Sequence, residues 1–221
     1  RYLARIPVPP SAAQTFGDTL HRTLKDFYKG VKEGQKLAKK DLSQILQNNW
    51  SSLGYASKAH ENKMKNQAQR MLTKFYEHYD HKIVPKDLEQ PFMIKVSPDL
   101  KVGGKIDRVD QQKDGKLEII DYKTGKTLEQ KELDDSLQMT VYALAATDKG
   151  IYGKEAEDLI LTFYFLDSGE KKSTRRTSQQ LEEAKKEILE KAKEIQLSLF
   201  EPKPGMLCDF CEYKLICEAW S

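Results

Sequence analysis

The sequence has few cysteines, no long hydrophobic run and little excess of charge, and each of these absences narrows the class of protein. Only three cysteines occur among 221 residues, all within the last fourteen, so we expect no disulfide framework. The longest apolar runs, such as residues 159–166, are far too short to cross a bilayer. No secretory signal is visible at the start. We therefore expect a soluble globular protein in a reducing, cytoplasmic compartment.

The charge balance permits contact with a polyanion without requiring it. The net charge is +3, which falls well short of the basic excess of histone-like proteins. Hydrophobic residues make up 38% of the chain, and a chain of this length buries a continuous core. Because it begins at Arg1 rather than Met, we interpret the sequence as a fragment or a processed product.

Apolar spacing predicts helices on both sides of a group of strands. Steps of three and four residues predict three helices near the start, over residues 11–31, 42–50 and 64–79. Thr177 and Gln180 resemble a capping box, and the apolar stripe that follows predicts a long charged helix that continues to Leu199. Runs rich in β-branched and aromatic residues predict strands at 92–96, 102–109, 117–122 and 159–166. A helix over 137–146 lies between the last two strands, which is typical of an α/β sheet.

Two of these strands end in carboxylates. Residues 113–115 form a good hairpin loop in which Gly115 takes the left-handed conformation. A loop centred on Asp114 sets Asp107 opposite Asp121, with β-carbons about 4.5–5.5 Å apart, so that both can hold one hard divalent cation. Lys123 lies on the same face as Asp121 and would steady the charge that develops on a phosphodiester. The alternative is a set of salt bridges on a solvated sheet face.

Four short motifs carry a resemblance to a known family. GKIDRVD at residues 104–110 precedes IDYKTG at 120–125, and the helices contain FGDTLH at 16–21 and QMTVY at 138–142. Together they resemble the PD-(D/E)XK nuclease superfamily, specifically its RecB-like branch. The resemblance implies an α/β, restriction-endonuclease-like core with a central mixed β-sheet flanked by helices. It implies a single domain over 1–221, made of a helical region, a sheet core and a C-terminal helix with a cysteine tail, at 1–84, 85–175 and 176–221.

The resemblance also implies the roles of individual residues. Asp107, Asp121, the Tyr122 carbonyl and His21 would bind Mg²⁺ or Mn²⁺, and Lys123 would be the catalytic lysine. Gln138 and Tyr142, one helical turn apart, would approach the site together. Glu89 stands where relatives often carry a glutamate near the metal. The remaining histidines, His60, His78 and His81, match no motif and are interpreted as structural.

The cysteines resemble part of an iron-sulfur motif. Cys208, Cys211 and Cys217 have the spacing of the C-terminal ligands in AddB-type helicase-nucleases and Cas4 nucleases, which implies a 4Fe-4S cluster joining the chain ends. Its fourth cysteine is absent, and we expect it to precede Arg1, since residues 1–3 look like sequence that would follow it. The alternative is three reduced, partly buried thiols.

The function implied is a DNA nuclease, exonuclease rather than endonuclease, acting on single-stranded DNA in repair and recombination. No Gly-x4-Gly-Lys-Ser/Thr motif is present, so a helicase motor would lie elsewhere in the protein or on a partner. One alternative is a stand-alone Cas4-like nuclease of CRISPR adaptation. The other is an inactive DNA-binding module that holds a strand through Lys101, Lys105, Arg108, Lys126, Arg175 and Arg176.

Overall fold

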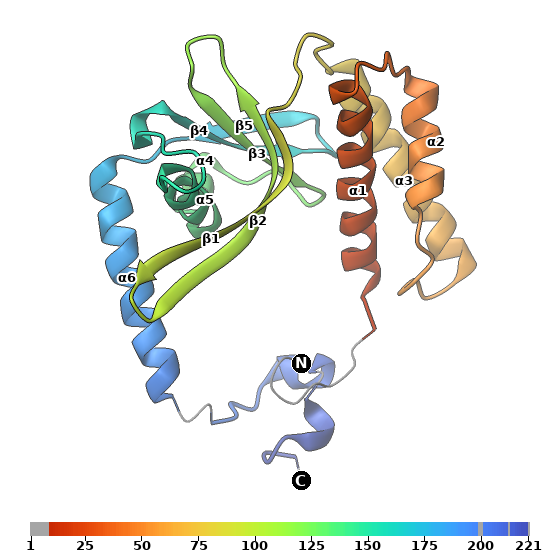
Figure 1. The fold of residues 1–221 in the computed structure, drawn as a ribbon. Helices are drawn as coiled ribbons and strands as arrows, with labels where there is room; N and C mark the ends of the chain where they lie inside the picture. Colours follow the sequence, from red (N-terminus) through yellow and green to blue (C-terminus); the bar gives the residue numbers. More distant parts are fainter. Residues whose placement is uncertain (1–8, 199–200, 212, 221) are drawn as a thin grey trace.

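The computed structural model describes residues 9–198, 201–211 and 213–220, and its centre is a five-stranded sheet in the order β1-β2-β3-β4-β5. The strands are β1 Asp87–Ser97, β2 Leu100–Gln111, β3 Leu117–Lys123, β4 Leu159–Phe165 and β5 Glu170–Thr174. Neighbouring strands run antiparallel, apart from the parallel pair β3 and β4 (Figure 1). The mixed sheet confirms the expected fold class.

Helices cover both faces of this sheet (Figure 1). Three long ones come first in the chain: α1 Ala12–Lys32, α2 Lys39–Asn49 and α3 Lys58–Glu77. The connection from β3 to β4 contains α4 Gln130–Asp134, α5 Leu137–Thr147 and the short 3-10 turn η1 Ala156–Asp158. After the sheet follow α6 Ser178–Leu197 and two more 3-10 turns, η2 Met206–Phe210 and η3 Lys214–Ile216.

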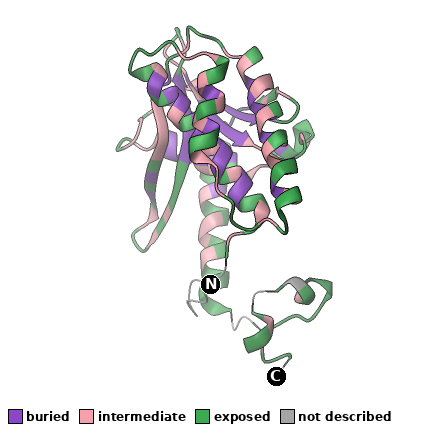
Figure 2. Ribbon diagram, turned by 90° about the vertical axis from the view of Figure 1, so that its right-hand side faces the viewer, coloured by how far each residue is buried: buried purple, intermediate pink, exposed green. Residues whose placement is uncertain are grey.

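Strand β3 is buried on both faces, which is why it reads as a nearly continuous apolar run. Ile119 packs in the core that α5 forms with one face of the sheet. Ile120 and Tyr122 point the other way, into the core formed with α1, α2 and α3. The buried residues in Figure 2 accordingly lie along the sheet and the inner sides of the helices. The end of β3 therefore lies between two helical layers.

The β2–β3 hairpin has the predicted register. Arg108 pairs with Ile120 and Gln111 with Leu117, and Gly115 adopts φ 85° in the connecting turn. The turn is closed by a 3.0 Å bond from Gly115 N–H to Gln112 O. The ladder ends at Arg108 and Ile120, one residue before Asp107 and Asp121, whose charges interact.

Strand β5, helix α4 and the three 3-10 turns were not predicted. Strand β5 consists of Glu, Lys, Lys, Ser and Thr, whose polar side chains suit an exposed edge strand but give no apolar alternation. Helix α4 has only five residues, too few to show a period. Strand β1 begins earlier than predicted and tolerates Pro91 because it is an edge strand.

The last helix is shorter and less buried than its apolar stripe predicted. The Thr177 capping box is confirmed, because Gln180 N–H donates to Thr177 Oγ1 at 3.2 Å. Leu181 and Ala184 are buried, but Ile195 and Leu197 are 59% and 83% exposed. The predicted end at Leu199 lies outside the described residues, as do residues 1–3. Only the first half of α6 therefore packs on the sheet.

The cysteine-bearing tail lies beyond the end of α6 and apart from the sheet (Figures 1 and 2). Its apolar side chains are largely uncovered: Met206 is 92% exposed and Leu215 99%. Across the part of the chain that the structure describes, no helix combines the length and the apolar character that crossing a membrane requires.

Candidate active site

Helix α1 carries His21 to the end of strand β3. The helix starts at a capping box in which Gln14 N–H donates to Ser11 Oγ at 3.2 Å. Ten residues further along, His21 Nε2 lies 2.9 Å from the carbonyl oxygen of Tyr122. Its other nitrogen, Nδ1, lies 3.2 Å from Asp107 Oδ1. The structure thus brings together three of the residues that the sequence assigned to a metal.

The surroundings of His21 favour a positive charge at this point. Burial alone would lower its pKa, but the hydrogen bond to Asp107 and the charges of Asp107, Asp121 and Glu89 outweigh burial and raise the pKa. Both ring nitrogens face acceptor oxygens, which only the doubly protonated ring can satisfy. A site that stabilises an imidazolium by converging oxygens is electrostatically suited to a cation.

Glu89 completes a compact group of possible ligands. One nitrogen of His21 and one carboxylate oxygen each from Glu89 and Asp107 lie within 4.8 Å of one another. Glu89 has φ 50°, a left-handed conformation that is uncommon outside glycine. Glu89 forms no pair in the β1–β2 ladder, in which Leu88 pairs with Arg108 and Gln90 with Ile106. This backbone distortion accompanies a carboxylate directed at His21 and Asp107, and Lys105 forms an ion pair with it.

Asp107 and Asp121 lie close enough for their charges to interact, but they have different partners. Asp107 Oδ2 accepts the backbone N–H of Tyr122 at 2.9 Å, so the side chain serves as a strand partner where the ladder ends. Burial raises the pKa of Asp121, and the charge of Asp107 raises it further against the opposing effect of Lys123. Asp121 is not a member of the 4.8 Å group. The two carboxylates are close enough to repel each other.

Helix α5 supplies the contacts that hold Asp121. Gln138 Nε2 and the Tyr142 hydroxyl both lie within hydrogen-bond distance of Asp121 Oδ1, at 2.8 and 2.9 Å. Lys123 Nζ donates to Gln138 Oε1 at 2.7 Å and lies 2.7 Å from Asp121 Oδ2. Burial, followed by the charges of Asp121 and Asp107, raises the pKa of Tyr142, which keeps its hydroxyl a donor. Gln138, Tyr142 and Lys123 thus form one network around Asp121.

The donor atoms fit a hard divalent cation. Carboxylate oxygens, a backbone carbonyl and one imidazole nitrogen form an oxygen-rich set that suits Mg²⁺ or Mn²⁺. Asp121 Oδ2 is buried and lies 2.7 Å from the Lys123 ammonium, and the nearby charge of Asp107 raises the pKa of Asp121. Carboxylates gathered this closely repel each other, and a divalent cation relieves that repulsion. The residues present therefore fit the metal.

Phe163 is a neighbour of Lys123 that the sequence did not identify. Strand β4 places it opposite Asp121, and its ring centroid lies 4.5 Å from Lys123 Nζ. The ring is 2% exposed, so it offers the ammonium group a fixed face. The parallel register of β3 and β4 creates this contact, and no local sequence signal encodes that register.

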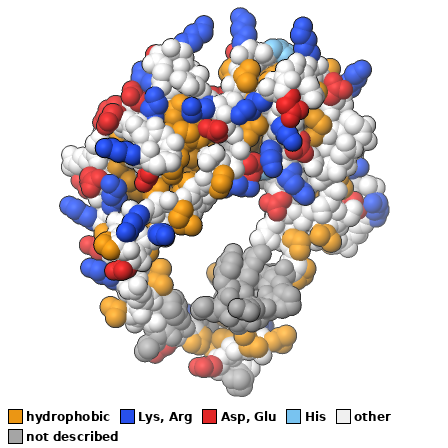
Figure 3. Space-filling view, viewed as in Figure 1, with side chains coloured by type: hydrophobic (Ala, Val, Ile, Leu, Met, Phe, Trp, Pro, Cys, Tyr) orange, Lys and Arg blue, Asp and Glu red, His pale blue; other side chains and the backbone are white. Residues whose placement is uncertain are grey.

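Two basic residues suggested as contacts for a DNA strand are buried, which is a correction. Arg108 is 2% exposed and its guanidinium pairs with Asp110 and bonds to the Tyr28 hydroxyl. Arg176 is 5% exposed and bonds to Thr140 Oγ1 and to the carbonyls of Leu133 and Ser136. Both arginines stabilise the interior. The sequence did not predict this, because a count of charged residues does not distinguish surface cations from buried ones. On the face in Figure 3, acidic and basic side chains are interspersed.

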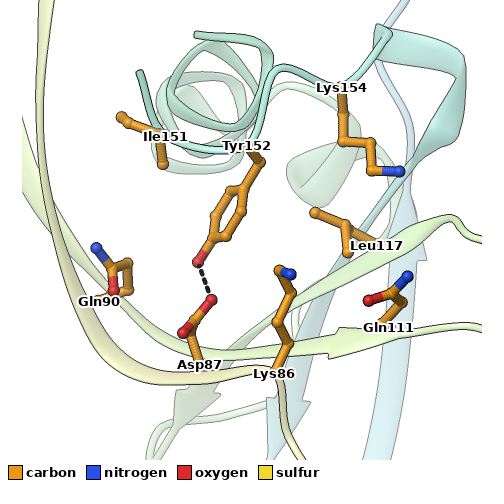
Figure 4. Close-up of a pocket in the computed structure, with 8 residues that line it drawn as sticks. All are labelled: Lys86, Asp87, Gln90, Gln111, Leu117, Ile151, Tyr152 and Lys154. Atoms are coloured by element: carbon orange, nitrogen blue, oxygen red, sulfur yellow. Dashed lines mark hydrogen bonds between the residues drawn. The ribbon is translucent and has the colours of Figure 1, made fainter. Parts of the chain in front are cut away.

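The hollow in Figure 4 lies at the start of β3, at the opposite end of the strand from the candidate site. It has a volume of about 390 Å³ and includes Leu117, the first residue of that strand. Three of its polar side chains are already paired: the Tyr152 hydroxyl donates to Asp87 at 3.0 Å, and Lys154 donates to Gly115 O at 2.8 Å. These bonds tie the start of β1 and the hairpin turn to the loop after α5, and we assign them a structural role.

The three cysteines are unpaired and line a common hollow of about 460 Å³ in the tail. The backbone N–H of Gly205 donates to Cys208 Sγ at 3.2 Å. Cys211 is exposed, and the other two are half-buried. The fold thus brings the three cysteines to one place.

Comparison with known proteins identifies the class to which this fold and site belong. The family model of the PD-(D/E)XK nuclease superfamily matches residues 1–218, and the chain belongs to that superfamily. Members of this superfamily are nucleases that use divalent metals, which agrees with the residues gathered around His21.

Two further comparisons add little. The chain is similar to the crystal structure of SSO0001 with 16% identity and a TM-score of 0.40, over 100% of this chain and 91% of that one. Values this low carry no argument about function. No match was found among curated proteins.

Proposed function

We propose that the protein is a divalent-metal-dependent exonuclease that acts on single-stranded DNA, and that it works with a helicase motor in DNA repair or recombination. The observation that carries the proposal is the convergence of His21, Glu89 and Asp107 beside the Asp121–Lys123 pair. Superfamily membership supports the nuclease reaction and DNA as substrate. The motif resemblance to helicase-nucleases supports the motor.

Each residue of the site has a role in this proposal. His21, Asp107, Asp121 and the Tyr122 carbonyl hold the metal, and Glu89 joins them as a fourth side chain. The bound metal would polarise the scissile phosphate and lower the pKa of an attacking water. Lys123 stabilises the charge that grows on the phosphate oxygens, because its ammonium group is held by Gln138 and Asp121 and faces the site. Tyr142 and Gln138 fix the orientation of Asp121.

The test is cleavage of DNA labelled at either end, as single strands and as duplexes, with Mg²⁺, Mn²⁺ or a chelator. We expect cleavage with Mg²⁺ or Mn²⁺, faster on single strands, and none when the metal is chelated. Release of mononucleotides or short products from one end would support exonuclease action. Cleavage that survives complete metal removal, or no cleavage of any substrate with either metal, would contradict the proposal.

We further propose that Cys208, Cys211 and Cys217 are ligands of a 4Fe-4S cluster. Support comes from their motif spacing, the common hollow that they line and the N–H bond to Cys208 Sγ. Three thiolates leave one position for a further ligand. The cluster would stabilise the tail, whose apolar side chains are largely exposed to solvent.

Anaerobic purification followed by iron and acid-labile sulfide analysis tests the cluster. We expect iron and sulfide to be bound together and both to be lost in Cys211→Ser, while Ser168→Ala leaves them unchanged. Bound zinc in place of iron, or iron content unaffected by Cys211→Ser, would show that the cluster assignment is wrong.

A further inference from the structure

A groove of about 580 Å³ opens directly beside the candidate metal site. His21 and Glu89 belong both to the metal-ligand group and to the lining of this groove. The opposite wall comes from the loop between α2 and α3, residues 51–56, which contributes Ser51 and Leu53. We call residues 51–56 the 51–56 loop. A substrate whose reacting atom lies at His21 must place neighbouring atoms along this wall.

The 51–56 loop is held in place by a buried carboxylate. Glu61, on α3, is 7% exposed and accepts hydrogen bonds from Trp50 Nε1 at 3.0 Å and Ser52 Oγ at 2.7 Å. Bonds from Lys58, Ser52 and Trp50 lower the pKa of Glu61 to about 2, so it remains an acceptor at neutral pH. The loop is therefore fixed at its base by charge-assisted hydrogen bonds.

The loop is also fixed near its tip. Gly54 has φ 80°, and a β-carbon at this position would lie 2.4 Å from Pro10 O, which no side chain tolerates. The rings of Trp50 and Tyr55 stack at 5.8 Å with an interplanar angle of 6°. The loop thus packs against the start of α1 in a single conformation that only glycine permits.

The 51–56 loop holds an apolar side chain, that of Leu53, exposed to solvent. Leu53 is 61% exposed and lines the groove. Single exposed leucines are common, but here Glu61 and Gly54 fix the position of the loop that carries it. Preorganised apolar contacts lower the entropy cost of binding. Leu53 is therefore placed to cover the sugar or base of a nucleotide.

A cation on α1 also lines the groove. Arg22 is exposed on α1, and its guanidinium contacts the carbonyls of Asp18 and Asn49 at 3.3 and 3.5 Å. Within the described part of the chain, no carboxylate lies within ion-pair distance of Arg22. The acidic groups of the groove are Asp18 and Glu89, and Lys105 pairs with Glu89. Arg22 is thus available for a phosphate next to the one at the metal.

We infer that the groove is a nucleotide subsite, in which Leu53 covers the sugar or base of the nucleotide flanking the scissile phosphate and Arg22 contacts the next phosphate. The inference rests on the proposed nuclease function for the location of the scissile phosphate. Glu61 touches no substrate in this arrangement and is a positioning residue for Leu53. The ligand class is a single strand of DNA, whose bases are free to contact a side chain.

The experiment measures both cleavage and binding of a fluorescent single-stranded oligonucleotide. In the active protein, Leu53→Asp should raise KM about tenfold with kcat changed by less than about twofold. The reason is that the Leu53 contact stabilises the bound substrate and the transition state equally. In an Asp121→Asn background, the same change should weaken Kd by about tenfold. The matched control is Val84→Asp, since Val84 is 56% exposed in a separate hollow near the other end of α1. Both variants should fold equally well.

Glu61 is tested by its coupling to Leu53. Glu61→Ala should raise KM as Leu53→Asp does, and the double variant should be no worse than either single one. Glu61→Gln keeps an acceptor oxygen and should recover most of the affinity. Additive losses, with no recovery in Glu61→Gln, would show that Glu61 has only a general structural effect and would overturn its positioning role.

The outcomes separate this inference from the proposed function. Unchanged oligonucleotide Kd in Leu53→Asp, or an equal loss in Val84→Asp, overturns the subsite whether or not the wild-type protein cleaves DNA. A protein that binds through Leu53 but never cleaves would overturn the nuclease proposal and leave the groove assignment supported.

Discussion

Asp121→Asn is expected to reduce DNA cleavage by at least about 10³-fold, because it removes one of the carboxylates that we propose as metal ligands. The asparagine oxygen can still accept hydrogen bonds from Gln138 and Tyr142, which both contact Asp121 Oδ1. Burial and the charge of Asp107 disfavour ionised Asp121, which offsets the loss of its ion pair with Lys123, so the variant should still fold. Initial rates on labelled single-stranded DNA, with thermal unfolding alongside, test both expectations.

Two other variants show whether the loss is specific to the site. Asp114→Asn removes a carboxylate from the exposed hairpin turn, where Asp114 pairs with Lys116 at 2.7 Å, and should leave cleavage unchanged. Lys123→Met should lower kcat by about 10²-fold while metal binding persists, because the ammonium group acts on charge that develops during the reaction. Full activity in Asp121→Asn would refute the assignment of the active site.

Asp110→Ala is expected to cause the largest loss of stability, about 3–5 kcal/mol, because it leaves Arg108 charged and buried without its carboxylate. Arg108 and Asp110 are 2% and 3% exposed, and Arg108 Nε donates to Asp110 Oδ1 at 2.7 Å. The guanidinium carbon also lies 4.0 Å from the centre of the Tyr28 ring, so the pair joins the sheet to α1. The melting temperature should fall by roughly 10 °C in a domain of this size.

The double variant separates a buried charge from a lost packing contact. Arg108→Met added to Asp110→Ala removes the uncompensated cation and should restore at least half of the lost stability. A decrease of less than about 1 kcal/mol in Asp110→Ala would show that Tyr28 and Tyr122 satisfy Arg108 without the carboxylate. Chemical denaturation with a two-state fit provides the measurement.

The local part of the site was predictable from the sequence. Alternation of side chains and the glycine turn predicted the β2–β3 register, and the structure confirms it from Arg108 to Gln111. Gln138 and Tyr142 were predicted to lie one helical turn apart, and both contact Asp121. These features depend on residues close in sequence, where periodicity and turn geometry suffice.

Residues distant in sequence could be assigned only through the family motifs. His21 is 101 residues from Tyr122, and nothing in its helix indicates which strand it will meet. Glu89 acquires its position from a left-handed backbone conformation at an edge strand, which no propensity predicts. The burial of Arg108 and Arg176 was missed for a similar reason, because their partners come from tertiary packing.

The sequence by itself determined the order of the helices and strands apart from α4 and β5, the register of the β2–β3 hairpin, and the clustering of cysteines in the tail. Only the tertiary structure decided that Glu89 joins His21 and Asp107, that α5 holds Asp121, and that the 51–56 loop forms a wall beside them. The physical reason is that short-range patterns encode local geometry, whereas convergence depends on how separate helical layers pack on one sheet.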